Sequence, residues 1–444
     1  MFRLPKARIV LLLIGDLITF YIALISVLTI RYGLDVSYNA LQEHSKPFTI
    51  IFSIWIATFY VLGLYDLRRL KNRLPFFTSL ALALSINLLT GLAFFYIVRA
   101  FGISPRANLL FITLGVAVLE ALWRSSFNRS IKRREPQNLL VVGTSPDIEK
   151  AITAVRENPQ LGFRVELWLV DGTADPRWTL VSENIKKHRI SAMVIPTHIK
   201  RDQRATQAIL NYLVQGVEVI DLTNLYEQIF NKTPITELEE IWFLEYLARH
   251  RILYETIKTI VEISLAFIIA ILTAPLTILA VIAVKLTSRG PIIYKQTRTG
   301  LKENSFVLYK FRTMRVDAES DGPKWATPND PRLTPIGKIL RNTHIDELPQ
   351  LWNILKGNIS FVGPRPERPE FIQELKKKIP FYEIRHLAKP GLTGWAQINY
   401  RYGSSVEDAY EKLQYDIFYL KYRSVVFDLL ITLKTIKSVF VSAK

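Results

Sequence analysis

The sequence predicts a mixed membrane protein in three parts: four transmembrane helices, an α/β middle domain with a parallel sheet, and an α-rich C-terminal domain. Apolar runs of spanning length fill the part before residue 125. Strand-like and helical patterns then alternate, as in βαβ units. The last part is basic and opens with a fifth apolar run. Hydrophobic residues make up 49% of the chain, and the net charge is +18.

The N-terminal part, residues 1–137, holds four apolar segments. A helix needs ~17–25 residues to cross the hydrocarbon, and each segment is near that length. No small-residue cleavage site follows the first one, so it is not interpreted as a signal peptide. The four segments are Ile9–Ile30, Phe48–Leu64, Phe76–Val98 and Leu109–Trp123.

Basic residues predict the orientation of these segments. They gather before the first segment, between the second and third, and after the fourth, whereas the two alternate loops carry fewer. The positive-inside bias therefore places both ends of the unit in the cytoplasm. The basic residues after the fourth segment are Arg124, Arg129, Lys132, Arg133 and Arg134.

The middle part, residues 138–250, has a soluble α/β rhythm. A helical stretch, Asp202–Gln215, separates the last two of four strand-like runs, which indicates a parallel sheet. A dinucleotide fold would have three glycines after its first strand, but only Gly143 is present. We therefore favour a degenerate Rossmann-like scaffold over a working nucleotide site, and a homodimer formed through it stays open. The four runs are Leu139–Gly143, Val165–Asp171, Ser191–Pro196 and Val217–Leu222.

The third part, residues 251–444, begins with an apolar run, Ile263–Val284, that carries no charge and is interrupted by Pro275. Proline removes an intrahelical hydrogen bond and clashes with the preceding turn, so it permits a sharp break. The pattern alone fits either a kinked spanning helix or a re-entrant helix over residues 258–286. A later stretch, Val425–Phe440, has helical spacing that suits an interfacial helix or a packed one.

Composition narrows the chemistry. Cysteine is absent, which excludes disulfides, thiolate catalysis and cysteine-ligated metals, and the six His residues form no His-x-x-x-His pair. A soluble nucleic-acid binder could carry the positive charge, but it would rarely carry spanning apolar runs as well. A membrane surface and anionic substrates therefore explain the charge better than nucleic acid does.

Paired acids and fixed cations gather between residues 296 and 366. Asp346 and Glu347 are adjacent, and Gly363–Pro366 holds Arg365 on a rigid segment suited to phosphate recognition. A single pair or cation has a plain structural explanation, such as a helix cap or a solvated face. Together they favour an anion site. The other candidates are Lys310, Arg312 and Arg341, with Gln296 and Arg298 in an expected polar turn.

Three long motifs of this region resemble the polyprenyl-phosphate sugar-1-phosphate transferases of bacterial exopolysaccharide and O-antigen synthesis, the monotopic phosphoglycosyl transferases. The resemblance covers about residues 254–440. The front end and middle domain are similar to the large form of that family. The motifs are KFRTM, DELPQLWNILKGNISFVGPRP and KPGLTGWAQINYR.

The resemblance implies roles for the matching residues. Asp346 corresponds to a nucleophile and Glu347 to its partner in the catalytic dyad, with Mg²⁺ as the cofactor that they hold. Lys310, Arg341 and Arg365 lie in motifs associated with phosphate-bearing substrates. Two further acids, Asp416 and Asp428, match acidic positions of the family and are candidate substrate-binding residues. One departure is that the break in the membrane helix is often Ser-Pro and here is Ala274-Pro275.

The implied chemistry selects the re-entrant helix. The substrates would be a UDP-sugar, made in the cytoplasm, and polyprenyl (undecaprenyl) phosphate, which lies in the bilayer among membrane lipids. A site that meets both must face the cytoplasm at the bacterial inner membrane, which a re-entrant helix allows. Glucose and galactose are the leading candidates for the transferred sugar.

Two competing functions are a polysaccharide-assembly scaffold or transport subunit, and a polytopic phosphotransferase. Transport through the bilayer usually needs ionisable residues inside the spans. These segments hold few, and Asp16 and Glu120 lie near their ends, which argues against a transport subunit. A polytopic phosphotransferase would carry its acids on membrane loops, whereas here they lie in a soluble basic segment.

Overall fold

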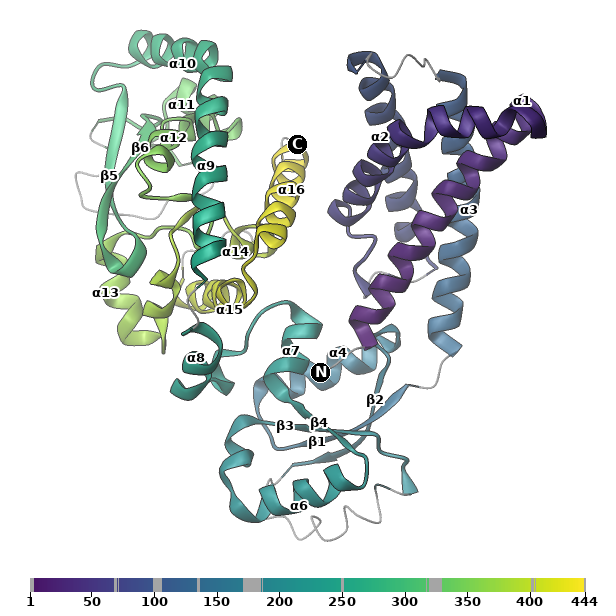
Figure 1. The fold of residues 1–444 in the computed structure, drawn as a ribbon. Coiled ribbons are helices and arrows are strands. Elements are labelled where there is room, and N and C mark those ends of the chain that lie inside the picture. The colour runs from purple at the N-terminus through teal and green to yellow at the C-terminus, as the bar shows by residue number, and fades with distance from the viewer. Residues whose placement is uncertain are drawn as a thin grey trace. The chain divides into compact units, whose positions relative to one another are not determined.

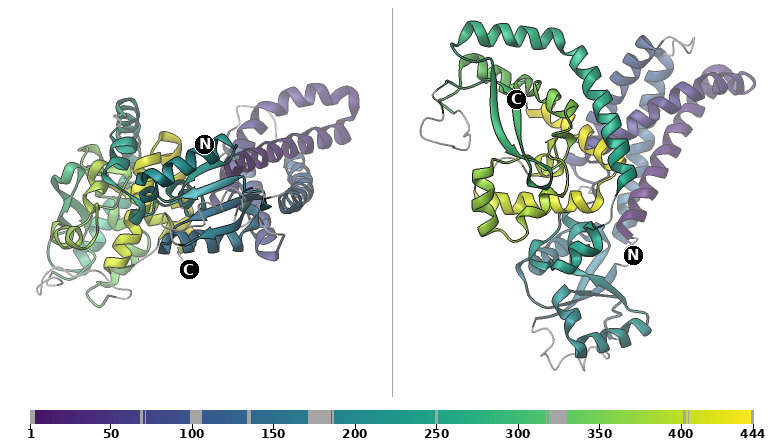
Figure 2. Two further views of the ribbon diagram at one scale, coloured as in Figure 1. Left: turned by 90° about the horizontal axis from the view of Figure 1, so that it is seen from below. Right: turned by 60° about the vertical axis from the view of Figure 1, so that its left-hand side comes forward.

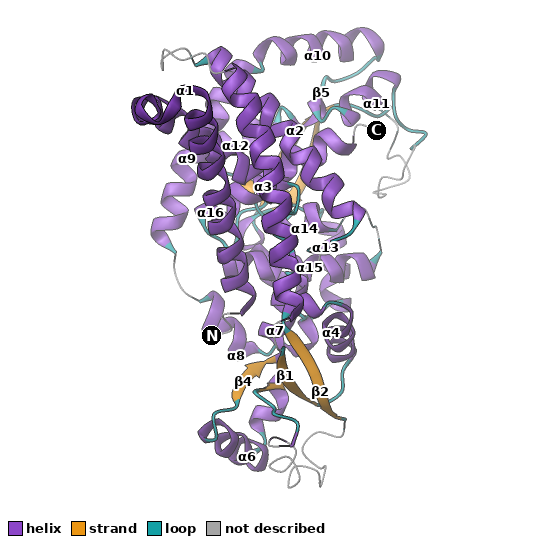
Figure 3. Ribbon diagram, turned by 90° about the vertical axis from the view of Figure 1, so that its right-hand side faces the viewer, coloured by secondary structure: helices purple, strands orange, loops and turns teal. Residues whose placement is uncertain are grey.

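The computed structural model describes residues 4–67, 70, 72–98, 106–133, 136–170, 185, 187–248, 251–316, 318, 330–400, 403 and 405–442. The chain divides into two compact units, Met1–Ile229 and Phe230–Lys444 (Figure 1). Helices predominate, and a parallel sheet lies in the first unit (Figure 3). By its contacts, the segment 230–248 belongs with the second unit.

The first two apolar segments form one hairpin. Helix α1 (Leu4–Val61) contains both of them and is interrupted at Gly33, whose φ of 76° only glycine adopts without strain (Figure 2). The chain turns back there, so that the Phe20 ring packs 5.2 Å from Phe52 and 5.7 Å from Phe59. The two arms are therefore antiparallel and share an aromatic core.

Helices α2 (Leu74–Ile97) and α3 (Arg106–Arg133) complete the membrane unit. In the described chain, three helical stretches of this unit have the length and apolar composition to cross a membrane: Ala7–Gly33, Leu74–Ile97 and Ala107–Ser130. The second predicted segment lies in the returning arm of α1, which is not one of the three. A bent helix pair in the second unit raises the number to four at most.

One basic residue proves to be internal to this unit. Arg124 was placed after the fourth segment, but that placement is wrong, because it lies inside the candidate span Ala107–Ser130 and its side chain is 0% exposed. Its Nη2 lies 2.5 Å from Asp16, and its Nε lies 2.9 Å from Glu120. The guanidinium also donates to the carbonyl of Leu64 over 2.8 Å. A buried charge needs such partners, so Arg124 joins α3 to the first arm of α1 and to the segment after its second arm.

The predicted parallel sheet is confirmed, with strand order β2-β1-β3-β4. Alternate residues of β1 point to opposite faces. Leu140 and Val142 pack in the cluster that contains the α6 side chains Ala205 and Ile209, while Val141 lies with α4 and α7. Helices therefore cover both faces. The elements are β1 (Gln137–Val142), α4 (Pro146–Glu157), η3 (Pro159–Leu161), β2 (Phe163–Leu169), β3 (Ala192–Ile195), η6 (Thr197–Arg201), α6 (Gln203–Val214), β4 (Glu218–Asp221) and α7 (Leu222–Phe230).

The second unit begins with the helix break that the sequence predicts. Helices α9 (Ile252–Leu272) and α10 (Ala274–Thr287) meet at 62° immediately before Pro275 (Figure 1). The hydroxyl that Ala274 lacks is present one position earlier, because Thr273 Oγ1 donates to the carbonyl of Ile269 over 2.7 Å. Both helices expose large apolar side chains, including Leu272 and Leu286.

The rest of the second unit packs short elements around α15 and beside α9. Trp242 and Phe243 of α8 share a buried cluster with Leu413 and Ile417 of α15, which explains why residue 230 onward belongs to this unit. The elements are η7 (Ile235–Glu237), α8 (Glu240–Leu247), β5 (Ile293–Thr299), η8 (Leu301–Glu303), β6 (Ser305–Phe311), α11 (Pro335–Asn342), η9 (Ile345–Glu347), α12 (Gln350–Leu355), β7 (Ser360–Val362), α13 (Pro369–Lys378), η10 (Tyr382–Leu387), β8 (Gly391–Thr393), α14 (Trp395–Asn399), α15 (Val406–Tyr422) and α16 (Val425–Ser442).

The polar turn expected at Gln296 and Arg298 is wrong. Both residues lie inside strand β5, which pairs antiparallel with β6. Gln296 is opposite Leu308, and Arg298 is opposite Phe306. The polar side chains suggested a turn, but β5 is also rich in β-branched and aromatic residues, which favour a half-buried strand.

Candidate active site

The two adjacent acids lie on a tight turn that follows α11. Thr334 caps this helix by accepting from the amide of Gly337 over 3.0 Å. A Cβ on Gly337 would lie 2.0 Å from the carbonyl oxygen of Thr313, so only glycine lets α11 approach the chain after β6 this closely. His344, with φ 56°, then ends the helical path and starts the 3₁₀ turn η9 with Asp346 and Glu347.

Asp346 carries a buried carboxylate. It is 6% exposed, and within the described part of the chain its side chain accepts no hydrogen bond and forms no ion pair. Burial raises its pKa, and adjacent Glu347 adds to the rise, while Lys310 and Arg341 oppose it. A poorly solvated carboxylate of raised basicity is a better nucleophile than a solvated one.

Glu347 has the opposite electrostatic environment. Lys310, on β6, places Nζ 2.7 Å from Glu347 Oε1. Burial would raise the pKa of this carboxyl, but the charges of Lys310 and Arg365 outweigh burial and hold it at about 2. Glu347 is therefore ionised throughout the physiological range, beside a neighbour that protonates more easily.

The cations around the two acids come from three elements. Lys310 lies on β6, Arg341 on α11, and Arg365 in the loop after β7. Arg341 Nε donates to Thr313 Oγ1 over 3.0 Å, which leaves its terminal nitrogens available. The Arg365 side chain is exposed. The predicted group of two acids and three cations is thus one electrostatic cluster.

Metal binding would rest on the two acids. Within the described residues, no group of three or more His, Asp or Glu side chains could enclose a metal ion. A cation such as Mg²⁺ is often held by one or two carboxylates, with water and substrate phosphate supplying the other oxygens. The free carboxylate of Asp346 and the remaining oxygen of Glu347 fit that donor set.

Three predicted substrate residues make structural contacts instead of joining this cluster. Arg312 is 5% exposed and donates to the carbonyl and the hydroxyl of Ser288, at the end of α10. Arg298 donates to Gln296 Oε1 over 2.9 Å and to the carbonyl of Pro366 over 2.9 Å. These contacts attach the β5–β6 hairpin to the membrane helix and to the Arg365 loop.

Asp416, on α15, is also remote from the acids in its contacts. It is 1% exposed, and its Oδ2 lies 2.8 Å from Arg385 Nη2. Burial raises the pKa of Asp416 to about 6, although the charge of Arg385 opposes that rise. Arg385 in turn donates to the carbonyl of Arg365 over 3.1 Å.

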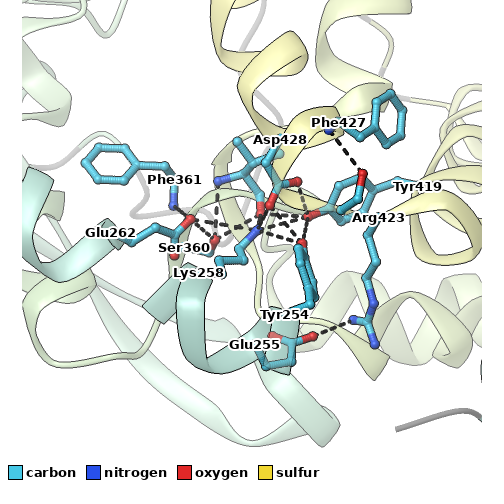
Figure 4. A network of polar contacts seen from close by, with 12 residues as sticks. Tyr254, Glu255, Lys258, Glu262, Ser360, Phe361, Tyr419, Arg423, Phe427 and Asp428 are labelled. Carbon is cyan, nitrogen blue, oxygen red and sulfur yellow. Dashed lines mark hydrogen bonds and ion pairs between the residues drawn. The ribbon is translucent and has the colours of Figure 1, made fainter. Parts of the chain in front are cut away.

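Asp428, on α16, lies in a second buried network (Figure 4). Lys258 Nζ, on α9, is 2.7 Å from Asp428 Oδ2 and 2.7 Å from the carbonyl oxygen of Val362. The hydroxyls of Tyr254 and Tyr419 donate to the same carboxylate over 2.8 and 2.9 Å. Asp428 thus faces a lysine and two phenols.

Sequence reasoning missed Lys258, Tyr254 and Arg385. A signal for the first two was present, because Tyr254, Lys258 and Glu262 recur at every fourth position before the apolar run. That spacing puts three polar side chains on one face of a helix. A membrane helix would turn such a face toward protein and away from lipid. Arg385 follows a proline-interrupted basic stretch and gave no comparable signal.

Comparison with known proteins supports the resemblance of the motifs. The family model for bacterial sugar transferases matches residues 253–442. A UDP-N-acetylgalactosamine-undecaprenyl-phosphate N-acetylgalactosaminephosphotransferase of Aeromonas hydrophila is 40% identical over 187 residues, or 42% of this chain and 44% of that protein. A UDP-glucose:undecaprenyl-phosphate glucose-1-phosphate transferase of Escherichia coli K12 is 40% identical over 188 residues, or 42% and 40%. The matched segment thus spans less than half of either relative.

A third relative extends the similarity to the first unit. The UDP-glucose:undecaprenyl-phosphate glucose-1-phosphate transferase of Klebsiella pneumoniae is 30% identical over 411 residues, which cover 86% of each chain. A match over 86% of the chain extends beyond the second unit into the first. The chain therefore belongs to the bacterial sugar transferase family, with the undecaprenyl-phosphate sugar phosphotransferases as its relatives.

Proposed function

We propose that this protein transfers a hexose-1-phosphate from a UDP-sugar to undecaprenyl phosphate, through a covalent intermediate on Asp346. The observation that carries the proposal is the free, buried carboxylate of Asp346 beside the Lys310–Glu347 ion pair. The product is a polyprenyl-diphosphate sugar, the first membrane-bound intermediate of exopolysaccharide or O-antigen synthesis.

The reaction has two displacements at one phosphorus. In the first, an Asp346 carboxylate oxygen attacks the phosphorus that bears the sugar. An oxygen–phosphorus bond forms, the bond to the bridging oxygen breaks, and UMP leaves with the electron pair. In the second, a phosphate oxygen of the lipid attacks the same phosphorus, and the carboxylate of Asp346 is released. Covalent catalysis of this kind divides one difficult transfer into two easier steps.

The cations supply what an anionic nucleophile needs to approach a diphosphate. Lys310, Arg341 and Arg365 present fixed positive charge around Asp346 and stabilise the phosphoryl oxygens and the leaving UMP. Glu347 remains charged because Lys310 lowers its pKa, and it completes the dyad. Mg²⁺, held by Asp346 and Glu347, would neutralise further phosphate charge.

The test is to add UDP-sugar to the purified protein with no lipid acceptor. The proposal expects about one UMP released per enzyme, together with a sugar-phosphate adduct on the peptide that contains Asp346. Undecaprenyl phosphate should then discharge the adduct. UMP release only in the presence of lipid, with no trapped adduct, would instead support direct transfer in a ternary complex. Screening UDP-glucose, UDP-galactose and UDP-N-acetylgalactosamine in this assay identifies the sugar.

We also propose a topology in which the returning arm of α1 is a fourth span and the α9–α10 pair is re-entrant at the bacterial inner membrane. The 62° bend at Pro275 and the exposed apolar faces of both helices support it. Both ends of the chain are then cytoplasmic, where UDP-sugars are made. Reporter tags after Arg134 and at Lys444 should report the same, cytoplasmic side, and a periplasmic signal at Lys444 would exclude the re-entrant helix. Pro275→Leu should straighten the break and reduce activity.

A further inference from the structure

The loop that carries Arg365 has no secondary structure of its own to hold it. It follows β7 and reads Gly363-Pro364-Arg365-Pro366, so two of its four residues lack an amide N–H. Backbone carbonyls in such a segment need donors from elsewhere in the protein. In the structure, cationic side chains donate to the carbonyls of Arg365 and Pro366 and to that of Val362 directly before the loop, while a backbone amide donates to that of Pro364.

Each of the three cations donates to a different carbonyl. Lys258 Nζ lies 2.7 Å from the oxygen of Val362, directly before the loop. Arg385 Nη2 lies 3.1 Å from the oxygen of Arg365 itself. Arg298 Nη1 lies 2.9 Å from the oxygen of Pro366. Lysine and arginine side chains therefore donate hydrogen bonds to backbone carbonyls here. Such charge-assisted hydrogen bonds are stronger than those between neutral groups.

The two acids that the sequence placed among the substrate ligands are the counterions of two of these cations. Asp428 lies 2.7 Å from Lys258, and Asp416 lies 2.8 Å from Arg385. Their side chains are only 13% and 1% exposed. A buried cation without a counterion is costly, so each acid keeps its cation charged and in place.

Backbone packing on the other side of the loop leaves it little freedom. The amide of Gly363 donates to Thr393 over 2.9 Å, and the amide of Gly391 donates to Pro364 over 2.9 Å. A Cβ on Gly363 would lie 2.2 Å from the carbonyl oxygen of Lys389. Only the Arg365 side chain extends outward, where its charge contributes to the low pKa of Glu347.

We propose that the ion pairs Lys258–Asp428 and Arg385–Asp416 are a two-point clamp that positions Arg365 on the diphosphate of the sugar donor. This role rests on the proposed function of the Asp346 site. Asp416 and Asp428 are positioning residues in this scheme and touch no substrate. Their effect reaches the reaction through the backbone of residues 362–365.

The clamp also connects the membrane helix to the reaction centre. Lys258 lies on α9, one turn before Glu262, whose Oε1 accepts from Ser360 Oγ over 2.5 Å and from the Phe361 amide over 3.0 Å (Figure 4). Lys258 and Glu262, one turn apart on α9, are thus both bonded to β7, and the Arg365 loop continues from β7. A displacement of α9 would be passed to Arg365 through these bonds.

A double-mutant cycle tests the clamp in the full-length protein. Asp428→Asn and Asp416→Asn should each lower kcat/KM for UDP-sugar roughly 10-fold, as loss of a supporting partner often does. In an Arg365→Ala background the same substitutions should cost less than about twofold, because the residue they position is gone. Equal losses in both backgrounds would overturn the proposal and leave the ion pairs a purely structural role.

Control variants separate positioning from folding. Glu255→Gln removes the 3.2 Å ion pair of α9 with Arg423, which touches no carbonyl of the loop, and should leave kcat/KM unchanged. If Asp428→Asn does not fold, Tyr419→Phe carries the same cycle, since its hydroxyl lies 3.2 Å from the Val362 oxygen and 2.9 Å from Asp428. An additive result for Tyr419→Phe overturns the clamp. Wild-type protein that releases no UMP would contradict the proposed function instead.

Discussion

Two turns of this molecule have similar backbone outlines but differ in whether their polar groups have hydrogen-bond partners. The loop after β1 in the first unit and the turn η9 in the second each follow a regular element and carry one residue with positive φ, Gly143 at 89° and His344 at 56°. The β1 loop satisfies itself, because Trp168 Nε1 donates to the Gly143 carbonyl over 2.9 Å and Ser145 Oγ caps α4 at the Ile148 amide over 3.2 Å.

The turn η9 does the reverse. Within the described chain, the carboxylate of Asp346 is left without a partner, and cations from β6, α11 and the β7 loop gather around it. Neutral hydrogen bonds therefore hold the β1 loop, whereas η9 concentrates charge at a cost in burial. Such a cost is usually retained where the charge is used. The comparison favours chemistry at η9, and it predicts that the sheet is a scaffold.

The strongest test of this contrast is Asp346→Asn. The amide is a poor nucleophile, so turnover and the adduct should both fall by roughly 1,000-fold or more. The matched control is Glu374→Gln, an exposed acid on α13 that should leave activity unchanged. Both are measured by UMP release and peptide mass spectrometry. Substantial residual turnover would reassign Asp346 to a supporting role, and Glu347→Gln would then show whether its neighbour is the reacting group.

A smaller effect is expected from Lys310→Met, roughly a 100-fold loss of kcat/KM at neutral pH. It should also move the pH profile. In the wild type, Glu347, with a pKa of about 2, stays ionised, and the acid limb follows Asp346, whose pKa is raised above its ordinary value. Removing the lysine charge raises both pKa values, so the acid limb should move to higher pH. An unchanged limb would mean that Lys310 does not act on these carboxyls.

The smallest effect should come from the β1 loop. Gly143→Ala forces an alanine to a φ of 89°, with its Cβ 3.2 Å from Pro196, and should cost about 1 kcal/mol of stability. The melting temperature of this variant should fall, whereas its kcat per folded molecule should not change. Calorimetry with NAD⁺ should detect no tight binding by the wild-type protein. Stoichiometric binding lost in Gly143→Ala would assign the sheet a cofactor and end the contrast.

Some of this protein follows from the sequence because the signals are local. Apolar runs predicted the three helices of the first unit that could cross a membrane. Short apolar runs separated by helical stretches predicted the four strands to within two residues at each end. Pro275 predicted the break between α9 and α10, since a proline acts on its own helix turn. The adjacent acids and Arg365 were recognisable because their motifs are continuous in the chain.

Only the tertiary structure decided what long-range pairing controls. It buried Arg124 between two acids, placed Gln296 and Arg298 in a strand, and paired Asp416 with Arg385 and Asp428 with Lys258. The sequence does not show whether a charged side chain contacts water, a phosphate or a backbone carbonyl. Its partner lies far away in sequence, as Lys258 does from Val362 and Asp428, and packing alone brings them together.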